Sequence, residues 1–196
     1  MYKKQMKLQK ILCLALLIVS ATIFVYSLGI MTDLYDALYT TIRSAKNLDK
    51  STVTGSRVYY DMQPFNKLFL RLSIGMILVC LTLFITNTQN RRKYYIGNYC
   101  SIALVAAGGI AFTVWAHGQI ETFKAQFLRI NFEELAKHAE KRKTLYTEST
   151  FWFDIHYLIF GLLIIGIVLL IGSTIWKRKL MKEEQALIAG GKETTV

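Results

Sequence analysis

Four polar side chains lie near the ends of long apolar stretches of this sequence, where polar groups commonly point to function. Charged and ionisable groups at membrane depth must be paired or face water. If the stretches carrying them are neighbouring helices, Asp154 can pair with Arg71. The simpler interpretation is that Arg71 extends outward and the others lie at the level of the lipid headgroups. These residues are our candidates for an outer-interface polar cluster: Arg71, His117, Asp154 and His156.

A metal site built from His117, Asp154 and His156 is a sharper alternative, and the spacing argues against it. Asp154 and His156 are two positions apart, which places them about 200° apart around a helix. One helix therefore cannot present both to one ion. The sequence predicts no metal-binding, cofactor-binding or catalytic residues.

Enzymatic chemistry finds little support in the rest of the sequence. An enzyme acting on a lipid or surface polymer would need Asp154, His117 or His156 as acid or base, and nothing around them completes a mechanism. A phosphate-binding glycine loop, a G-x-S-x-G elbow, an H-E-x-x-H helix and a kinase signature set are all missing. We therefore expect a protein that is not an enzyme.

The apolar residues are concentrated in long blocks, which is typical of a membrane protein. The 196 residues are 53% hydrophobic and 19% charged. Each block is long enough to cross a hydrocarbon core of about 30 Å as a helix. The sequence predicts an all-α integral membrane protein with one domain over 1–184 and a mobile tail over 185–196. The four predicted transmembrane helices cover residues 9–32, 64–88, 94–118 and 151–176.

The positive charge flanks the apolar blocks, which indicates a role in membrane orientation. The formal net charge is +11, and Lys and Arg are dense at the N-terminus, in the turn over 87–93 and over 177–182, directly after the fourth block. Such segments stay on the cytoplasmic side and contact anionic lipid. We expect both termini in the cytoplasm of a bacterial plasma membrane, with membrane lipid and no nucleic acid as partner.

The two connections predicted on the outer side, 33–63 and 119–150, contain amphipathic segments. Apolar residues recur at helical spacing in both, with charged residues between them in the second. We interpret these segments as helical extensions beyond the bilayer. The apolar side of the second is a candidate surface for contact with a partner protein, formed by Phe123, Phe127, Ile130 and Leu135.

Four runs of sequence resemble a group of uncharacterised four-helix membrane proteins. The runs are YSLGIMTDLYDALY from Tyr26, GSRVYYDMQPFNK from Gly55, RRKYYIGNY from Arg91 and TESTFWFDIHY from Thr147. Proteins of this group look like companions of sugar ABC-transporter permeases in Gram-positive bacteria. The resemblance covers most of the chain and implies a permease as partner, but it assigns no catalytic or binding residue.

These observations favour a non-enzymatic accessory or scaffolding subunit of a membrane transport complex, such as a carbohydrate ABC transporter. Small residues on the third and fourth helices, including Gly108 and Gly161, suit close helix contact with such a partner. The alternative is a small channel or carrier that works as a homo-oligomer. That alternative requires polar residues facing a shared axis, and the helix centres offer mainly Thr82, Ser101 and Thr113.

Overall fold

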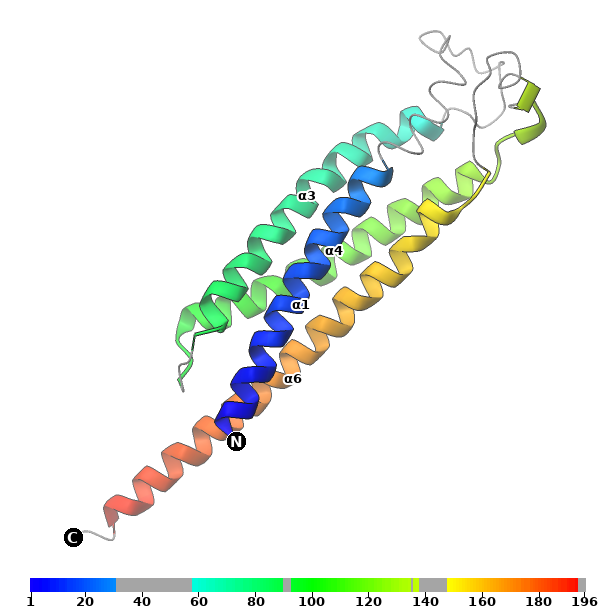
Figure 1. Ribbon diagram of the computed structural model, residues 1–196. Helices are drawn as coiled ribbons and strands as arrows, with labels where there is room; N and C mark the ends of the chain where they lie inside the picture. Colours follow the sequence, from blue (N-terminus) through cyan, green and yellow to red (C-terminus); the bar gives the residue numbers. More distant parts are fainter. Residues whose placement is uncertain (31–57, 90–92, 135, 138–147, 194–196) are drawn as a thin grey trace. The chain divides into compact units, whose positions relative to one another are not determined.

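The described part of the chain is helical, with four long helices. The computed structural model describes residues 1–30, 58–89, 93–134, 136–137 and 148–193. Figure 1 labels the long helices as α1, α3, α4 and α6. Their bounds are Tyr2–Gly29 for α1, Val58–Asn87 for α3, Ile96–Phe127 for α4 and Phe151–Glu193 for α6.

All four helices are long and apolar enough to cross a membrane, which confirms the predicted fold class at this level. α4 continues to Phe127, well beyond the predicted end at residue 118. The helical extension expected after the third membrane block is therefore present up to that residue. The corresponding part of the first connection, over 31–57, lies outside the described residues.

Two helix ends differ from the prediction. Pro64 was expected to begin the second membrane helix, but α3 begins at Val58 and contains Pro64 in its second turn. Proline is tolerated in a first turn because those N–H groups have no partner within the helix, and here it lies one turn further on. At the other end of the chain, α6 continues to Glu193 through the tail that we expected to be mobile. The tail begins with Gln185, Ala186 and Leu187, which favour helix, and Gly190 and Gly191 come in the last turn of α6.

Each helix contributes a segment to two compact units. Unit 1 comprises Met1–Ala21, Gly75–Ile110 and Leu162–Val196, and unit 2 comprises Thr22–Ile74 and Ala111–Gly161. Unit 1 has an aliphatic core in which four leucines are at most 1% exposed: Leu16, Leu83, Leu163 and Leu170.

Unit 2 has an aromatic core centred on Phe69 of α3, which is fully buried. The Phe69 ring stacks on Phe65 and on Phe112 of α4, with centroid distances of 5.4 and 5.5 Å. Tyr26 of α1 and Phe160 of α6 meet it edge-on at 5.9 and 6.4 Å. One phenylalanine thus joins segments of all four helices, and stacked and edge-on contacts of this kind stabilise beyond simple area burial.

The glycines of unit 1 divide into two groups. A Cβ atom on Gly166 of α6 would lie 2.7 Å from Leu16 of α1, and one on Gly109 of α4 would lie 2.7 Å from Ile167 of α6. Gly108 and Gly172 have nothing within 4 Å of that position. Gly109 and Gly166 therefore allow the helices of unit 1 to pack closely against one another. Gly108 and Gly172 leave small open places on the outer side of α4 and α6.

Candidate functional site

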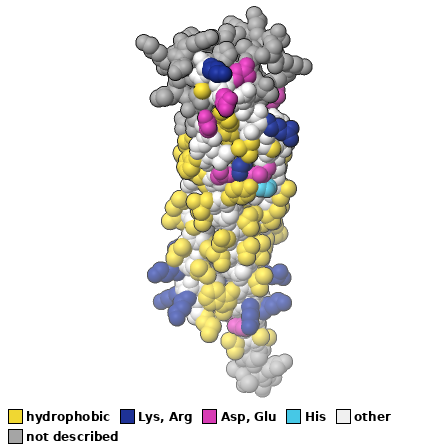
Figure 2. Space-filling model, turned by 90° about the vertical axis from the view of Figure 1, so that its right-hand side faces the viewer, with side chains coloured by type: hydrophobic (Ala, Val, Ile, Leu, Met, Phe, Trp, Pro, Cys, Tyr) yellow, Lys and Arg dark blue, Asp and Glu magenta, His cyan; other side chains and the backbone are white. Residues whose placement is uncertain are grey.

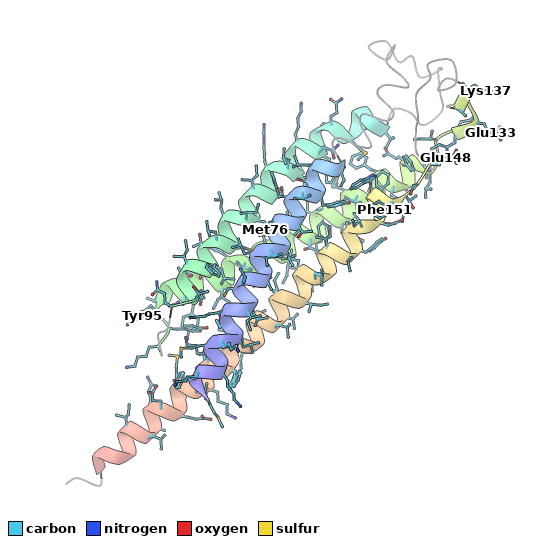
Figure 3. All side chains as sticks on the ribbon, in the orientation of Figure 1. Met76, Tyr95, Glu133, Lys137, Glu148 and Phe151 are labelled. Atoms are coloured by element: carbon cyan, nitrogen blue, oxygen red, sulfur yellow. The ribbon has the colours of Figure 1, made fainter. Side chains whose placement is uncertain are left out.

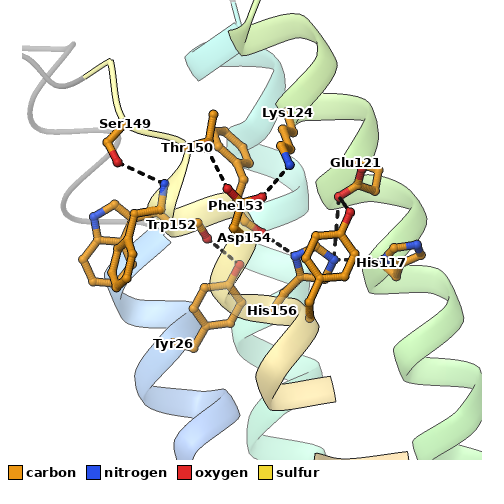
Figure 4. Close-up of polar contacts among 12 residues, drawn as sticks. Tyr26, His117, Glu121, Lys124, Ser149, Thr150, Trp152, Phe153, Asp154 and His156 are labelled. Carbon is orange, nitrogen blue, oxygen red and sulfur yellow. Dashed lines mark hydrogen bonds and ion pairs between the residues drawn. The ribbon is translucent and has the colours of Figure 1, made fainter. Parts of the chain in front are cut away.

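Two histidines meet where α4 lies beside the first turns of α6 (Figure 4). His117 Nδ1 of α4 is 2.8 Å from Nε2 of His156, whose side chain is fully buried. The other ring nitrogen of His156, Nδ1, contacts the carbonyl oxygen of Phe153. Because a carbonyl only accepts, Nδ1 carries the proton in the neutral ring and Nε2 presents a lone pair to His117.

Glu121 completes this group from the next turn of α4. Its Oε1 atom lies 3.8 Å from Nε2 of His156 and accepts a hydrogen bond of 2.7 Å from the Tyr157 hydroxyl. Glu121 lies four positions after His117, so both point to the same side of α4. We call His117, Glu121 and His156 the histidine–glutamate cluster.

Asp154 belongs to a neighbouring set of contacts with a structural role. Its carboxylate pairs with the Lys124 ammonium and accepts a hydrogen bond of 2.6 Å from the Thr150 hydroxyl. The Thr150 carbonyl accepts from the N–H groups of Phe153 and Asp154, and Ser149 Oγ accepts from the N–H of Phe151. These contacts begin α6 at Phe151, with Ser149 and Thr150 as its capping residues. Figure 3 labels Phe151 at this point.

Of the four residues expected to form the outer cluster, the structure brings His117 and His156 together. Asp154 pairs with Lys124 and not with Arg71. Arg71 of α3 is exposed and makes no hydrogen bond or ion pair with the described part of the chain.

The predicted partner surface on the second outer connection requires correction. Phe123, Phe127 and Ile130 are at most 7% exposed and belong to the core of unit 2. Phe123 contacts Phe65, and Phe127 contacts Phe153, with ring centroids 5.5 and 5.1 Å apart. Their helical spacing reflects packing against α3 and α6 within the chain. Leu135 lies outside the described residues.

Unit 1 has a polar cluster of its own, which the sequence analysis did not single out. Ser173 Oγ donates to Oε1 of Gln9 at 2.6 Å and accepts from Nε2 of Gln5 at 3.2 Å, and all three side chains are buried. Nearby, Lys177 Nζ lies 4.0 Å from the centroid of the Tyr94 ring. The glutamine–serine contacts join α1 to α6 and are typical of polar links between membrane helices.

Sequence reasoning missed Glu121 and Lys124, although a signal was present for both. His117, Glu121 and Lys124 recur at intervals of four and three residues, which places them along one side of a helix. The sequence places Glu121 and Lys124 in an amphipathic connection, whereas the predicted cluster draws its residues from the apolar blocks. A comparison with models of known families, with curated proteins and with solved structures finds no match to the chain.

Proposed function

We propose that this chain is a multi-pass protein of a bacterial plasma membrane that acts as a non-enzymatic accessory subunit of a transport complex. Its partner is a membrane-embedded permease, of the kind that the resemblance to companions of sugar ABC transporters implies. The proposal places both termini in the cytoplasm and the histidine–glutamate cluster near the outer membrane interface.

The observation that carries the proposal is a small-residue face on the exposed side of α4. Ala103, Ala107 and Gly108 are exposed, whereas the adjacent Gly109 faces Ile167 within unit 1. A leucine side chain packs against lipid tails as well as an alanine or glycine does. Small residues therefore bring no advantage to a helix face that contacts lipid alone. They do let the backbone of another helix approach closely, because association in lipid depends on packing contacts. We call Ala103, Ala107 and Gly108 the α4 small face.

Charge supports the proposed orientation. The Tyr2 hydroxyl donates to Glu184 Oε2 at 3.0 Å, so the beginning of α1 lies beside the last part of α6. The lysines that precede the first apolar block and the basic residues that follow the fourth belong to unit 1. Figure 2 shows Lys and Arg side chains beside a broad exposed hydrophobic face. Such a collection of basic residues is retained on the cytoplasmic side.

The channel alternative receives less support from the side chains that it needs. Ser101 is buried and makes hydrogen bonds of 2.8 Å with Thr86 and Asn87 inside unit 1. Thr82 donates to the Leu78 carbonyl of its own helix. Ser101 is thus engaged inside unit 1 and poorly placed to line a path shared between protomers, whereas the exposed Thr82 remains available to such a path.

The test is purification of the tagged chain from its native membrane in mild detergent, followed by mass spectrometry of proteins recovered in stoichiometric amount. We expect a permease to accompany the wild-type chain. Gly108→Leu places a large side chain on the α4 small face and should weaken binding of the permease about five- to 150-fold, since steric overlap of this size costs roughly 1–3 kcal/mol.

The matched control is Gly172→Leu, which adds the same bulk at an open position of α6. It should recover the permease as the wild type does. Recovery of the chain alone, or equal recovery from both variants, would contradict the role of the α4 small face. A clean homo-oligomer would favour the channel alternative.

A further inference from the structure

We propose that His117, Glu121 and His156 bind one divalent transition-metal ion of the zinc class. Each residue offers one ligand atom, and the three atoms lie within 4.8 Å of one another. Two imidazoles and a carboxylate form a donor set that suits zinc and its first-row neighbours. The proposal is independent of the accessory role and concerns only unit 2.

The spacing of the ligand atoms is close to what a metal ion requires. Ligands at about 2.0–2.1 Å from a tetrahedral zinc ion are roughly 3.3 Å apart. The observed separations from His156 Nε2 are 2.8 Å to His117 Nδ1 and 3.8 Å to Glu121 Oε1, one shorter and one longer than this value. The three atoms all lie within 4.8 Å of one another, so binding requires the side chains of His117 and Glu121, both on α4, to close on the buried His156.

The metal ion would bind between the two imidazoles, where the structure has a hydrogen bond between their nitrogens. His156 Nε2 accepts from His117 Nδ1–H, because His156 Nδ1 donates to the Phe153 carbonyl. Metal binding replaces this hydrogen bond: the single proton of the neutral His117 ring leaves Nδ1 and is carried by the exposed Nε2, which is the other tautomer of the same ring. Both imidazoles then bind as neutral ligands.

The residues around the cluster already hold two ligands in place, as outer contacts do in known metal sites. The Phe153 carbonyl fixes the tautomer and orientation of His156, and the Tyr157 hydroxyl holds the Glu121 carboxylate. Metal-binding histidines almost always donate their second N–H to a carbonyl or carboxylate, and ligating carboxylates are themselves hydrogen-bonded. Three polar side chains that lie together by chance would need neither the Phe153 contact nor the Tyr157 hydrogen bond.

Access and local charge also suit a cation. His117 is exposed and the Glu121 side chain is 36% exposed, so an ion can reach the cluster and keep water as a further ligand. The nearby Lys124 ammonium is paired with Asp154, which removes most of its repulsion. Glu121 supplies the remaining negative charge. Figure 2 shows acidic, basic and histidine side chains together at the margin of the exposed hydrophobic face.

The test uses the full chain, purified with a tag that contains no histidine, placed in lipid nanodiscs and freed of metal with a chelator. Zinc is titrated against a fluorescent chelator, and the visible absorption of bound cobalt reports its coordination. We expect one ion per chain. His117→Ala should weaken zinc binding at least about 100-fold, Glu121→Gln at least about tenfold and Tyr157→Phe about tenfold.

Two controls separate lost ligands from lost structure. Glu133→Gln removes an exposed carboxylate outside the cluster and should leave the affinity within about twofold of wild type. Far-ultraviolet circular dichroism verifies that each variant keeps its helices, and Glu121→Gln keeps the shape of the residue that it replaces. Absence of zinc binding to the wild type, or binding unchanged in both His117→Ala and Glu121→Gln, would overturn the proposal. Loss in His117→Ala with no change in Glu121→Gln would contradict the three-ligand site.

Discussion

The Phe69→Ala variant is expected to lose about 3 kcal/mol of unfolding free energy, a large part of the stability of a protein of this size. Phe69 is fully buried in unit 2, and its ring contacts aromatic rings from all four helices. Alanine would leave a cavity that these rings can fill only by moving the helices. In lipid the transfer contribution is reduced, because the tails are as apolar as the core, so we place the loss at the low end of values for buried phenylalanines.

The measurement is unfolding of the purified chain by increasing SDS in mixed micelles, followed by circular dichroism. Leu68→Ala is the matched control, since Leu68 precedes Phe69 on α3 and is 44% exposed. Its loss should stay below about 1 kcal/mol, because a side chain in contact with lipid leaves no cavity. Equal losses in the two variants would show that Phe69 does not join the helices as described.

The second large effect is expected from Gly166→Leu, which should lower the unfolding free energy by about 3 kcal/mol or prevent folding. A Cβ atom at Gly166 would lie 2.7 Å from Leu16 Cδ2 and 3.3 Å from Leu16 Cγ. Leu16 is 1% exposed and has little room to move, so a leucine at 166 must push α1 away from α6. Overpacking of this kind typically costs about 1–3 kcal/mol, and more where the backbone must move.

Gly172→Leu makes the same substitution on the same helix, where a Cβ atom meets nothing within 4 Å. It should leave the unfolding free energy unchanged or raise it slightly, since leucine favours helix over glycine by roughly 0.5–1 kcal/mol. The difference between the two variants therefore measures the contact of α1 with α6. Similar stabilities for both would contradict that contact.

The sequence predicted the four apolar helices well because their signal is local. A charge-free block long enough to cross a bilayer is visible without knowledge of its neighbours. Helix ends were less accurate, since helix propensity carried α6 through the tail to Glu193 and α3 begins before Pro64. The predicted boundaries follow the apolar blocks, whereas residues outside those blocks that favour helix, such as Gln185, Ala186 and Leu187, also belong to the helices.

The candidate site was only partly predictable because it depends on which helices are neighbours. Spacing alone showed that Asp154 and His156 point apart, and the structure shows Asp154 engaged with Lys124 while His156 meets His117. Spacing could not distinguish an exposed apolar stripe from a buried one. Phe123 and Phe127 recur at helical intervals in either case, and only the packing of α3 and α6 against them decides that they are buried.

The most direct test of the proposed function is photo-crosslinking in the native membrane from Leu104, which lies beside the α4 small face. A photoreactive residue there is compared with one at Leu78 of α3, and both positions are 58% exposed. We predict that residue 104 crosslinks to one permease subunit and that residue 78 does not. Crosslinks from residue 104 to lipid alone, or the same protein captured from both positions, would contradict the proposal that α4 binds a permease.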